Sequence, residues 1–140
     1  MSPETIRVMF VDDNRLMAEG LQRRLAFETG LEYVGWVESA GEALQTAEDT
    51  KAGVVVLDVD MPGDSFGLVQ RFAQSAPGVR VVMFSGHIRR EFVDRAIDSG
   101  AWGYISKNES MGVVIDAIRR VAGGEFVLSP DVEAACRVER

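Results

Sequence analysis

The chain has 140 residues, 46% of them apolar, and its formal net charge is -7. This length fits one domain, and this apolar content is enough for one sizeable core, which excludes a chain that is disordered by composition. The 15 lysines and arginines are scattered along an acidic chain, whereas direct binding to nucleic acid requires a clustered basic surface. We therefore expect no nucleic-acid binding by this chain itself.

Cysteine content and the lengths of the apolar runs indicate the environment. The single cysteine, Cys136, excludes an internal disulfide and a cysteine-based metal cage. The longest apolar run, 52–57, is too short to span a bilayer, and the first ten residues lack the pattern of a signal peptide. These features predict a cytoplasmic protein without a membrane partner.

Apolar segments rich in β-branched and aromatic residues predict five strands, at 6–11, 32–37, 53–57, 79–84 and 102–106. The segments between and after them have apolar residues at helical spacing, most clearly Met111, Val114, Ile115, Ile118 and Val121. Strands that are apolar on both faces are typical of a parallel sheet covered by helices. We therefore predict an α/β, flavodoxin-like (βα)5 fold, a doubly wound parallel five-stranded sheet with strand order 2-1-3-4-5.

The C-terminal segment departs from this alternation. Gly123 and Gly124 end the fifth helical segment, and Ser129-Pro130 resembles the start of another helix. We expect residues 1–122 to form the domain. Residues 123–140 are predicted to be a linker that leads to a missing or absent output domain.

Polar residues follow or end four of the five predicted strands: Asp12 with Asp13, Asp58, Ser85 and Lys107. The carboxyl ends of parallel strands lie at one edge of a sheet, so these side chains should converge. Three carboxylates in one place repel each other and require a hard cation, for which Mg²⁺ is suited. Asp58 could then accept a phosphoryl group, if Mg²⁺ and Lys107 neutralise the incoming oxygens and Ser85 donates its hydroxyl.

Each of these residues alone has a plainer interpretation. An Asp-Asp pair before Asn14 is more often a helix cap, and a lone serine is more often a cap or turn residue. Lys107 alone would be a solvated lysine. Only their combination favours a phosphoryl and metal site.

The segments "FVDDN", "VLDVDMPG", "MFSGH" and "SGAWGYISK" stand in an order and spacing that resemble the receiver domain of bacterial two-component response regulators. The resemblance covers roughly residues 5 to 122. The tail "GGEFVLSPDV" is similar to the link between the receiver and the helix-turn-helix domain in the NarL/FixJ-type subfamily. Two positions depart from the family pattern: Asn108 stands where proline often follows the lysine, and Gly67 lies one residue further than usual from the acceptor aspartate.

The resemblance implies that a sensor histidine kinase phosphorylates Asp58. It also implies that Mg²⁺ is held by Asp12, Asp13, Asp58 and the backbone carbonyl of Asp60. Phosphorylation is then expected to promote a homodimer. DNA would be bound only through an output domain outside this chain, so the chain would be a phosphoacceptor and not an enzyme.

The resemblance further implies that Ser85 and Lys107 sense the phosphoryl group, and that Tyr104 is an aromatic switch which rotates from an outward to a buried position. A tyrosine on a strand is otherwise usually just a packing residue. Asp60 and His87 flank the predicted phosphoryl site and could affect the access of water to it. As an isolated feature, His87 is an exposed loop residue.

Three other functions are open to the same residues. A stand-alone single-domain regulator would use the same site without an output domain. A haloacid-dehalogenase-type phosphohydrolase is suggested by Asp58-Val59-Asp60, but its aspartates close the first strand and it needs a cap domain for which this chain has no room. A flavodoxin-like flavin carrier would need a phosphate-binding loop after the first strand, which is absent.

Overall fold

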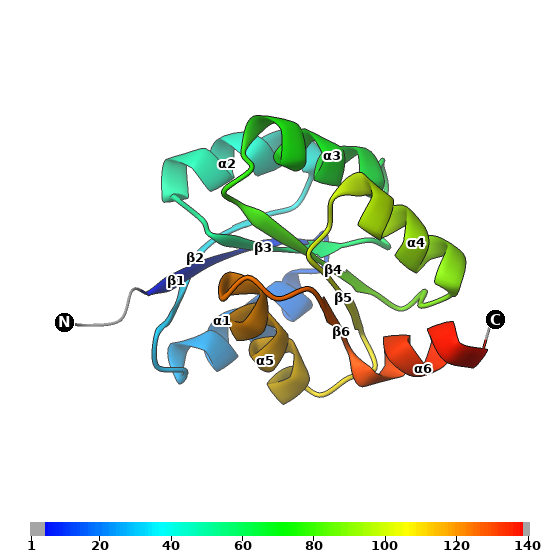
Figure 1. The fold of residues 1–140 in the computed structure, drawn as a ribbon. Coiled ribbons are helices and arrows are strands. Elements are labelled where there is room, and N and C mark those ends of the chain that lie inside the picture. Colours follow the sequence, from blue (N-terminus) through cyan, green and yellow to red (C-terminus); the bar gives the residue numbers. More distant parts are fainter. Residues whose placement is uncertain (1–4, 139–140) are drawn as a thin grey trace.

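A computed structural model describes residues 5–138 and shows a parallel sheet between two layers of helices (Figure 1). The strands of this part of the chain are β1 (Ile6–Val11), β2 (Leu31–Val37), β3 (Val54–Asp58), β4 (Arg80–Ser85), β5 (Gly103–Ser106) and β6 (Val127–Leu128). The helices are α1 (Arg15–Ala26), α2 (Ala43–Thr50), α3 (Ser65–Ser75), α4 (Arg90–Ser99), α5 (Met111–Ala122) and α6 (Pro130–Val138), with a short 3-10 turn, η1, at Ala40–Glu42.

The strand order in the described part of the chain is β2-β1-β3-β4-β5-β6, and every pair is parallel. The predicted doubly wound fold and its order 2-1-3-4-5 are therefore confirmed. The sheet has one strand more than predicted, because the two-residue β6 pairs with the outer edge of β5.

Alternating strand residues build two cores, one on each face of the sheet. Met9, Val55 and Met83 share a cluster with residues of α2, α3 and α4, whereas Phe10 and Val56 share one with residues of α1 and α5. These two sets of helices cover opposite faces of the sheet (Figure 1). Both sets of strand residues are fully buried or nearly so, which is the pattern of strands covered on both faces. The strand ends are thereby held rigidly at one edge of the sheet.

Short polar side chains start the helices that follow the functional strands. Asn14 caps α1 by accepting a hydrogen bond from the N–H of Met17, at 3.2 Å. Asp64 caps α3 through the N–H of Gly67, at 2.9 Å. Because Asn14 serves as the cap of α1, both aspartates before it are available for other contacts.

The segment after α5 is folded against the sheet as far as residue 138. Ser129 donates its N–H to the carbonyl of Tyr104 at 3.1 Å, and its Oγ accepts from the N–H of Ser106 at 3.1 Å. Val132 of α6 is fully buried, and the N–H of Asp131 donates to Glu109 Oε1 at 2.7 Å. The linker role of residues 123–140 stays a prediction, and residues 1–4 and 139–140 lie outside the described part of the chain.

None of the helices within residues 5–138 combines the length and apolar character that a membrane span requires.

Candidate functional site

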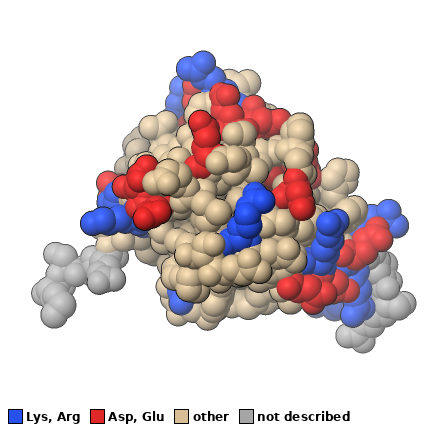
Figure 2. All heavy atoms as spheres, turned by 90° about the horizontal axis from the view of Figure 1, so that it is seen from above, with Lys and Arg blue, Asp and Glu red and all other residues tan. Residues whose placement is uncertain are grey.

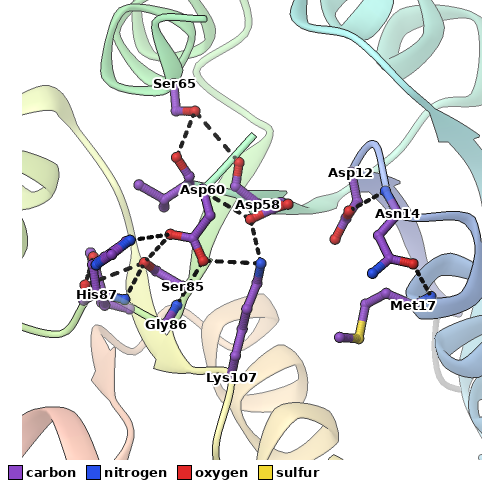
Figure 3. Close-up of polar contacts among 12 residues, drawn as sticks. Asp12, Asn14, Met17, Asp58, Asp60, Ser65, Ser85, Gly86, His87 and Lys107 are labelled. Carbon is purple, nitrogen blue, oxygen red and sulfur yellow. Dashed lines mark hydrogen bonds and ion pairs between the residues drawn. The ribbon is translucent and has the colours of Figure 1, made fainter. Parts of the chain in front are cut away.

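The carboxyl ends of four strands bring the predicted polar residues to one rim of the sheet (Figure 3). Asp12 and Asp13 follow β1, Asp58 ends β3, Ser85 ends β4 and Lys107 follows β5. The strand order reverses at β1 and β3, which is where open α/β sheets bind their ligands.

Three carboxylates meet at this rim. One carboxylate oxygen from each of Asp12, Asp13 and Asp58 lies within 4.8 Å of the other two. Asp12 and Asp58 are buried, whereas Asp13 is exposed. Such a cluster is unfavourable unless a proton or a cation neutralises part of its charge.

The carboxyl group of Asp12 is the least satisfied of the three. Its Oδ1 accepts a hydrogen bond from the N–H of Asn14 at 2.7 Å, whereas its Oδ2 is buried without a hydrogen-bond partner among the described residues. Burial raises the pKa of Asp12 to about 7 against the lowering effect of the Asn14 N–H, and the charge of Asp58 raises it further. A buried, unpaired carboxylate oxygen beside two other acids suits a hard divalent cation, so these residues fit Mg²⁺.

Asp58 and Lys107 form a close ion pair. Lys107 Nζ lies 2.8 Å from Asp58 Oδ1, and the same oxygen accepts the N–H of Asp60 at 2.9 Å. Burial alone would lower the pKa of Lys107, but the hydrogen bonds and charges of Asp58 and Asp60 outweigh it and raise that pKa. The lysine is therefore a cation beside Asp58 at neutral pH.

The side chain of Asp60 lies in the middle of the remaining donors (Figure 3). Its Oδ1 accepts a hydrogen bond from Ser85 Oγ at 2.8 Å, and its Oδ2 accepts the N–H of Gly86 at 2.9 Å. Lys107 Nζ lies 3.0 Å from Oδ2. Burial would raise the pKa of Asp60, but the N–H of Gly86, the Ser85 hydroxyl and Lys107 together hold it below its usual value. Asp60 is thus ionised and bound by three donors.

A chain of hydrogen bonds leads from Ser85 to Tyr104. The N–H of His87 donates to Ser85 Oγ at 2.9 Å, and Tyr104 Oη donates to the carbonyl of His87 at 2.5 Å. Tyr104 is 1% exposed, and burial raises the pKa of its hydroxyl. The ring therefore has the buried position here. The His87 ring is mostly exposed, with Nε2 at 3.9 Å from Asp60 Oδ1.

The sequence pattern brought the right residue types together but missed the position of the Asp60 carboxylate. An acid two residues after Asp58 indicated only proximity, because the turn after β3 decides where its side chain points. The sequence pattern also did not indicate Ser65. Its buried hydroxyl lies 3.5 Å from the carbonyl oxygens of Asp58 and Val59. The Lys107–Asn108 peptide bond is trans, since residues 5–138 contain no cis peptide bond.

Comparison with known proteins identifies the family. Residues 8–119 match the family described as "Response regulator receiver domain". The chain is 35% identical over 128 residues to the response regulator GacA of Pseudomonas viridiflava, covering 91% of this chain and 60% of that protein. It is 32% identical over 129 residues to the response regulator protein VraR of Staphylococcus aureus, covering 91% of this chain and 62% of that protein. The chain thus spans about 60% of the length of these curated relatives.

Solved structures agree with this assignment. A two-component response regulator of the LuxR family from Aurantimonas superposes with a TM-score of 0.91 at 29% identity, over 98% of this chain and 99% of that one. The receiver domain of the putative response regulator NarL from Mycobacterium tuberculosis gives a TM-score of 0.82 at 28% identity, over 88% of this chain and 100% of that one. The predicted resemblance to receivers of the NarL type is confirmed, and the chain belongs to the receiver domain family of two-component response regulators.

Proposed function

We propose that Asp58 accepts a phosphoryl group from the phosphohistidine of a sensor histidine kinase. An Asp58 carboxylate oxygen would attack phosphorus while the bond from phosphorus to the kinase imidazole nitrogen breaks, which leaves an aspartyl phosphate. The observation that carries this proposal is the Lys107 ammonium, 2.8 Å from a carboxylate that is only 3% exposed. A carboxylate so placed has a cation ready for the incoming phosphoryl oxygens.

The other residues of the rim support this chemistry. Mg²⁺, bound by Asp12, Asp13, Asp58 and the backbone carbonyl of Asp60, would supply positive charge at the phosphoryl oxygens. Ser85 and Lys107 would bind those oxygens, and Tyr104, the switch residue, would keep the inward position that goes with a bound anion. The chain is then a stoichiometric phosphoacceptor, not an enzyme that turns over an external substrate.

This proposal predicts one phosphoryl group per chain when the protein is incubated with a small phosphodonor and Mg²⁺. Intact-mass spectrometry measures the stoichiometry, and Asp58→Asn should abolish it. Asp64→Asn, in the loop after β3, is the matched control, because asparagine caps α3 as well as aspartate does. Labelling that persists in Asp58→Asn, or in excess chelator, would contradict the proposal. Continuous release of phosphate would favour the phosphohydrolase instead.

We further propose that phosphorylation regulates transcription through a helix-turn-helix output domain outside this chain. The relation to GacA and VraR supports this output, because the chain matches only about 60% of their length. The face seen in Figure 2 carries acidic and basic side chains interspersed, without a continuous basic patch among its described residues. The chain alone is therefore expected not to bind a specific DNA sequence. A stand-alone regulator that switches a protein partner is the alternative.

Phosphorylation is also expected to promote self-association of this chain. A switch between two arrangements changes an association equilibrium only by the difference in their contact energies, typically a few kcal/mol. Beryllofluoride with Mg²⁺, which imitates the phosphoryl group, should therefore raise the sedimentation coefficient of the wild type but not of Asp58→Asn. An equal response of both chains would exclude Asp58 as the acceptor.

A further inference from the structure

We propose that the Asp60 carboxylate is an internal anion that occupies the phosphoryl-binding donors of this receiver and holds Ser85 and Tyr104 inward before phosphorylation. The inference rests on the proposed function of Asp58 and concerns the regulation of that same site. It assigns to Asp60 a role as competitor of the phosphoryl group.

The contacts of Asp60 are those that a phosphoryl group on Asp58 would need. Its two carboxylate oxygens take up the Ser85 hydroxyl, the Gly86 N–H and the Lys107 ammonium, at 2.8, 2.9 and 3.0 Å. These groups come from β4, the loop after it and the end of β5, so they converge on Asp60 from separate elements (Figure 3). A carboxylate bound by three converging donors satisfies an anion site from within the chain.

Asp60 also fixes the direction of Ser85. Asp60 Oδ1 is the nearer acceptor of the Ser85 hydroxyl, at 2.8 Å, against 3.3 Å for the carbonyl oxygen of His87, and Ser85 Oγ accepts the N–H of His87 at 2.9 Å. The carbonyl of His87 in turn accepts the hydroxyl of Tyr104. The inward position of Tyr104 is therefore connected to Asp60 through Ser85 and the backbone of His87.

The buried Tyr104 supports the C-terminal helix. Tyr104 belongs to the same core cluster as Val132 of α6, and Leu128 and Cys136 pack against that cluster. The carbonyl of Tyr104 also accepts the N–H of Ser129, just before α6. The position of Asp60, the inward Tyr104 and the docked tail are thus parts of one connected arrangement.

If Asp60 competes with the phosphoryl group, its removal should strengthen the binding of a phosphoryl analogue and weaken the inward position of Tyr104. A phosphoryl group and the Asp60 carboxylate carry like charges and need the same lysine, so Asp60 must leave when the phosphoryl group binds. Asp60→Ala should therefore bind a phosphoryl analogue more tightly, since no donors are occupied in advance. The same variant should lose the inward Tyr104 in the unliganded state.

Fluorine NMR can follow both consequences. The chain has two tyrosines, Tyr33 and Tyr104, so 3-fluorotyrosine labelling gives two protein signals, and Tyr33→Phe assigns them. In the wild type, the Tyr104 signal should move little when beryllofluoride and Mg²⁺ are added. In Asp60→Ala, it should differ from the wild type without ligand and return to the wild-type position with ligand. The fluorine signal of bound beryllofluoride should show an affinity at least about threefold tighter than in the wild type.

Two further variants complete the test. Asp60→Asn keeps the size of the side chain without its charge and should give the same directions with a smaller effect. Asp64→Asn changes the same charge in the same loop and should match the wild type in both readouts. If Asp60→Ala and Asp60→Asn both retain the wild-type Tyr104 signal, or bind beryllofluoride no more tightly, the internal-anion role is wrong while Asp58 stands as acceptor. If no variant with Asp58 intact binds beryllofluoride, the proposed function fails as well.

Discussion

Replacing Lys107 by alanine is expected to lower the free energy of unfolding by about 2–3 kcal/mol in Mg²⁺-free buffer at neutral pH. Lys107 Nζ is the cation shared by Asp58 and Asp60, at 2.8 and 3.0 Å. Its removal leaves the charge of Asp58, which is 3% exposed, without that partner. The cost should therefore exceed the small effect of breaking an exposed ion pair. Urea unfolding followed by circular dichroism measures the difference.

The only other lysine provides the control. Lys51 is exposed at the end of α2 and forms no ion pair within residues 5–138. Its backbone is left-handed, with φ 56°, a conformation that asparagine tolerates. Lys51→Asn should therefore change the stability by less than about 0.5 kcal/mol. Saturating Mg²⁺ should recover part of the loss in Lys107→Ala, and equal losses in both variants would show that Lys107 does not neutralise the rim.

The metal-free wild type is expected to lose stability as the pH rises from about 4 to about 7, relative to Asp12→Asn. The pKa of Asp12 is raised from 3.8 to about 7 in the folded chain. Between these values the folded chain keeps a proton that the unfolded chain has released, so the free energy of unfolding falls with rising pH. Each pKa unit corresponds to about 1.4 kcal/mol, so the change should be on the order of 4 kcal/mol.

The difference between the two pH profiles isolates Asp12 from the other titrating groups. Asp60, whose pKa is lowered, contributes stability that is lost as the pH falls into the acid range, and it does so in both chains. Mg²⁺ should flatten the wild-type profile near neutral pH, since the cation replaces the proton in stabilising the cluster. Parallel profiles for wild type and Asp12→Asn would show that Asp12 titrates normally.

The alternation of elements was predictable because each strand and helix has enough residues to show its period. The apolar face of α5, from Val114 to Val121, is buried as its spacing indicates. The two-residue β6 has no period to detect. It forms because the edge of β5 offers unpaired backbone groups to Val127 and Leu128, which is a tertiary effect and not a local preference.

The residue types of the site were predictable from the strand ends, but the burial and the directions of their side chains were not. Asp12 and Asp13 are adjacent and chemically alike, yet one is buried and the other exposed, because the path of the loop after β1 decides which side chain faces inward. Asp60 and Tyr104 each have more than one allowed direction. The direction of Asp60 follows from donors that lie 25 residues and more away in sequence, and that of Tyr104 follows from the His87 carbonyl that accepts its hydroxyl.

The two edges of the sheet are both poor templates for another strand. At one edge, β6 covers β5 and is itself only two residues long before Ser129 and Pro130 end it. At the other edge, β2 pairs with β1 through an irregular register between Val8 and Met9, and Glu32 presents a charge there, bound to Arg7 at 3.0 Å. Short, irregular and charged edges resist the growth of a sheet from one molecule into the next. At the high local concentrations of an expressing cell, copies of this chain should therefore resist amyloid-like aggregation.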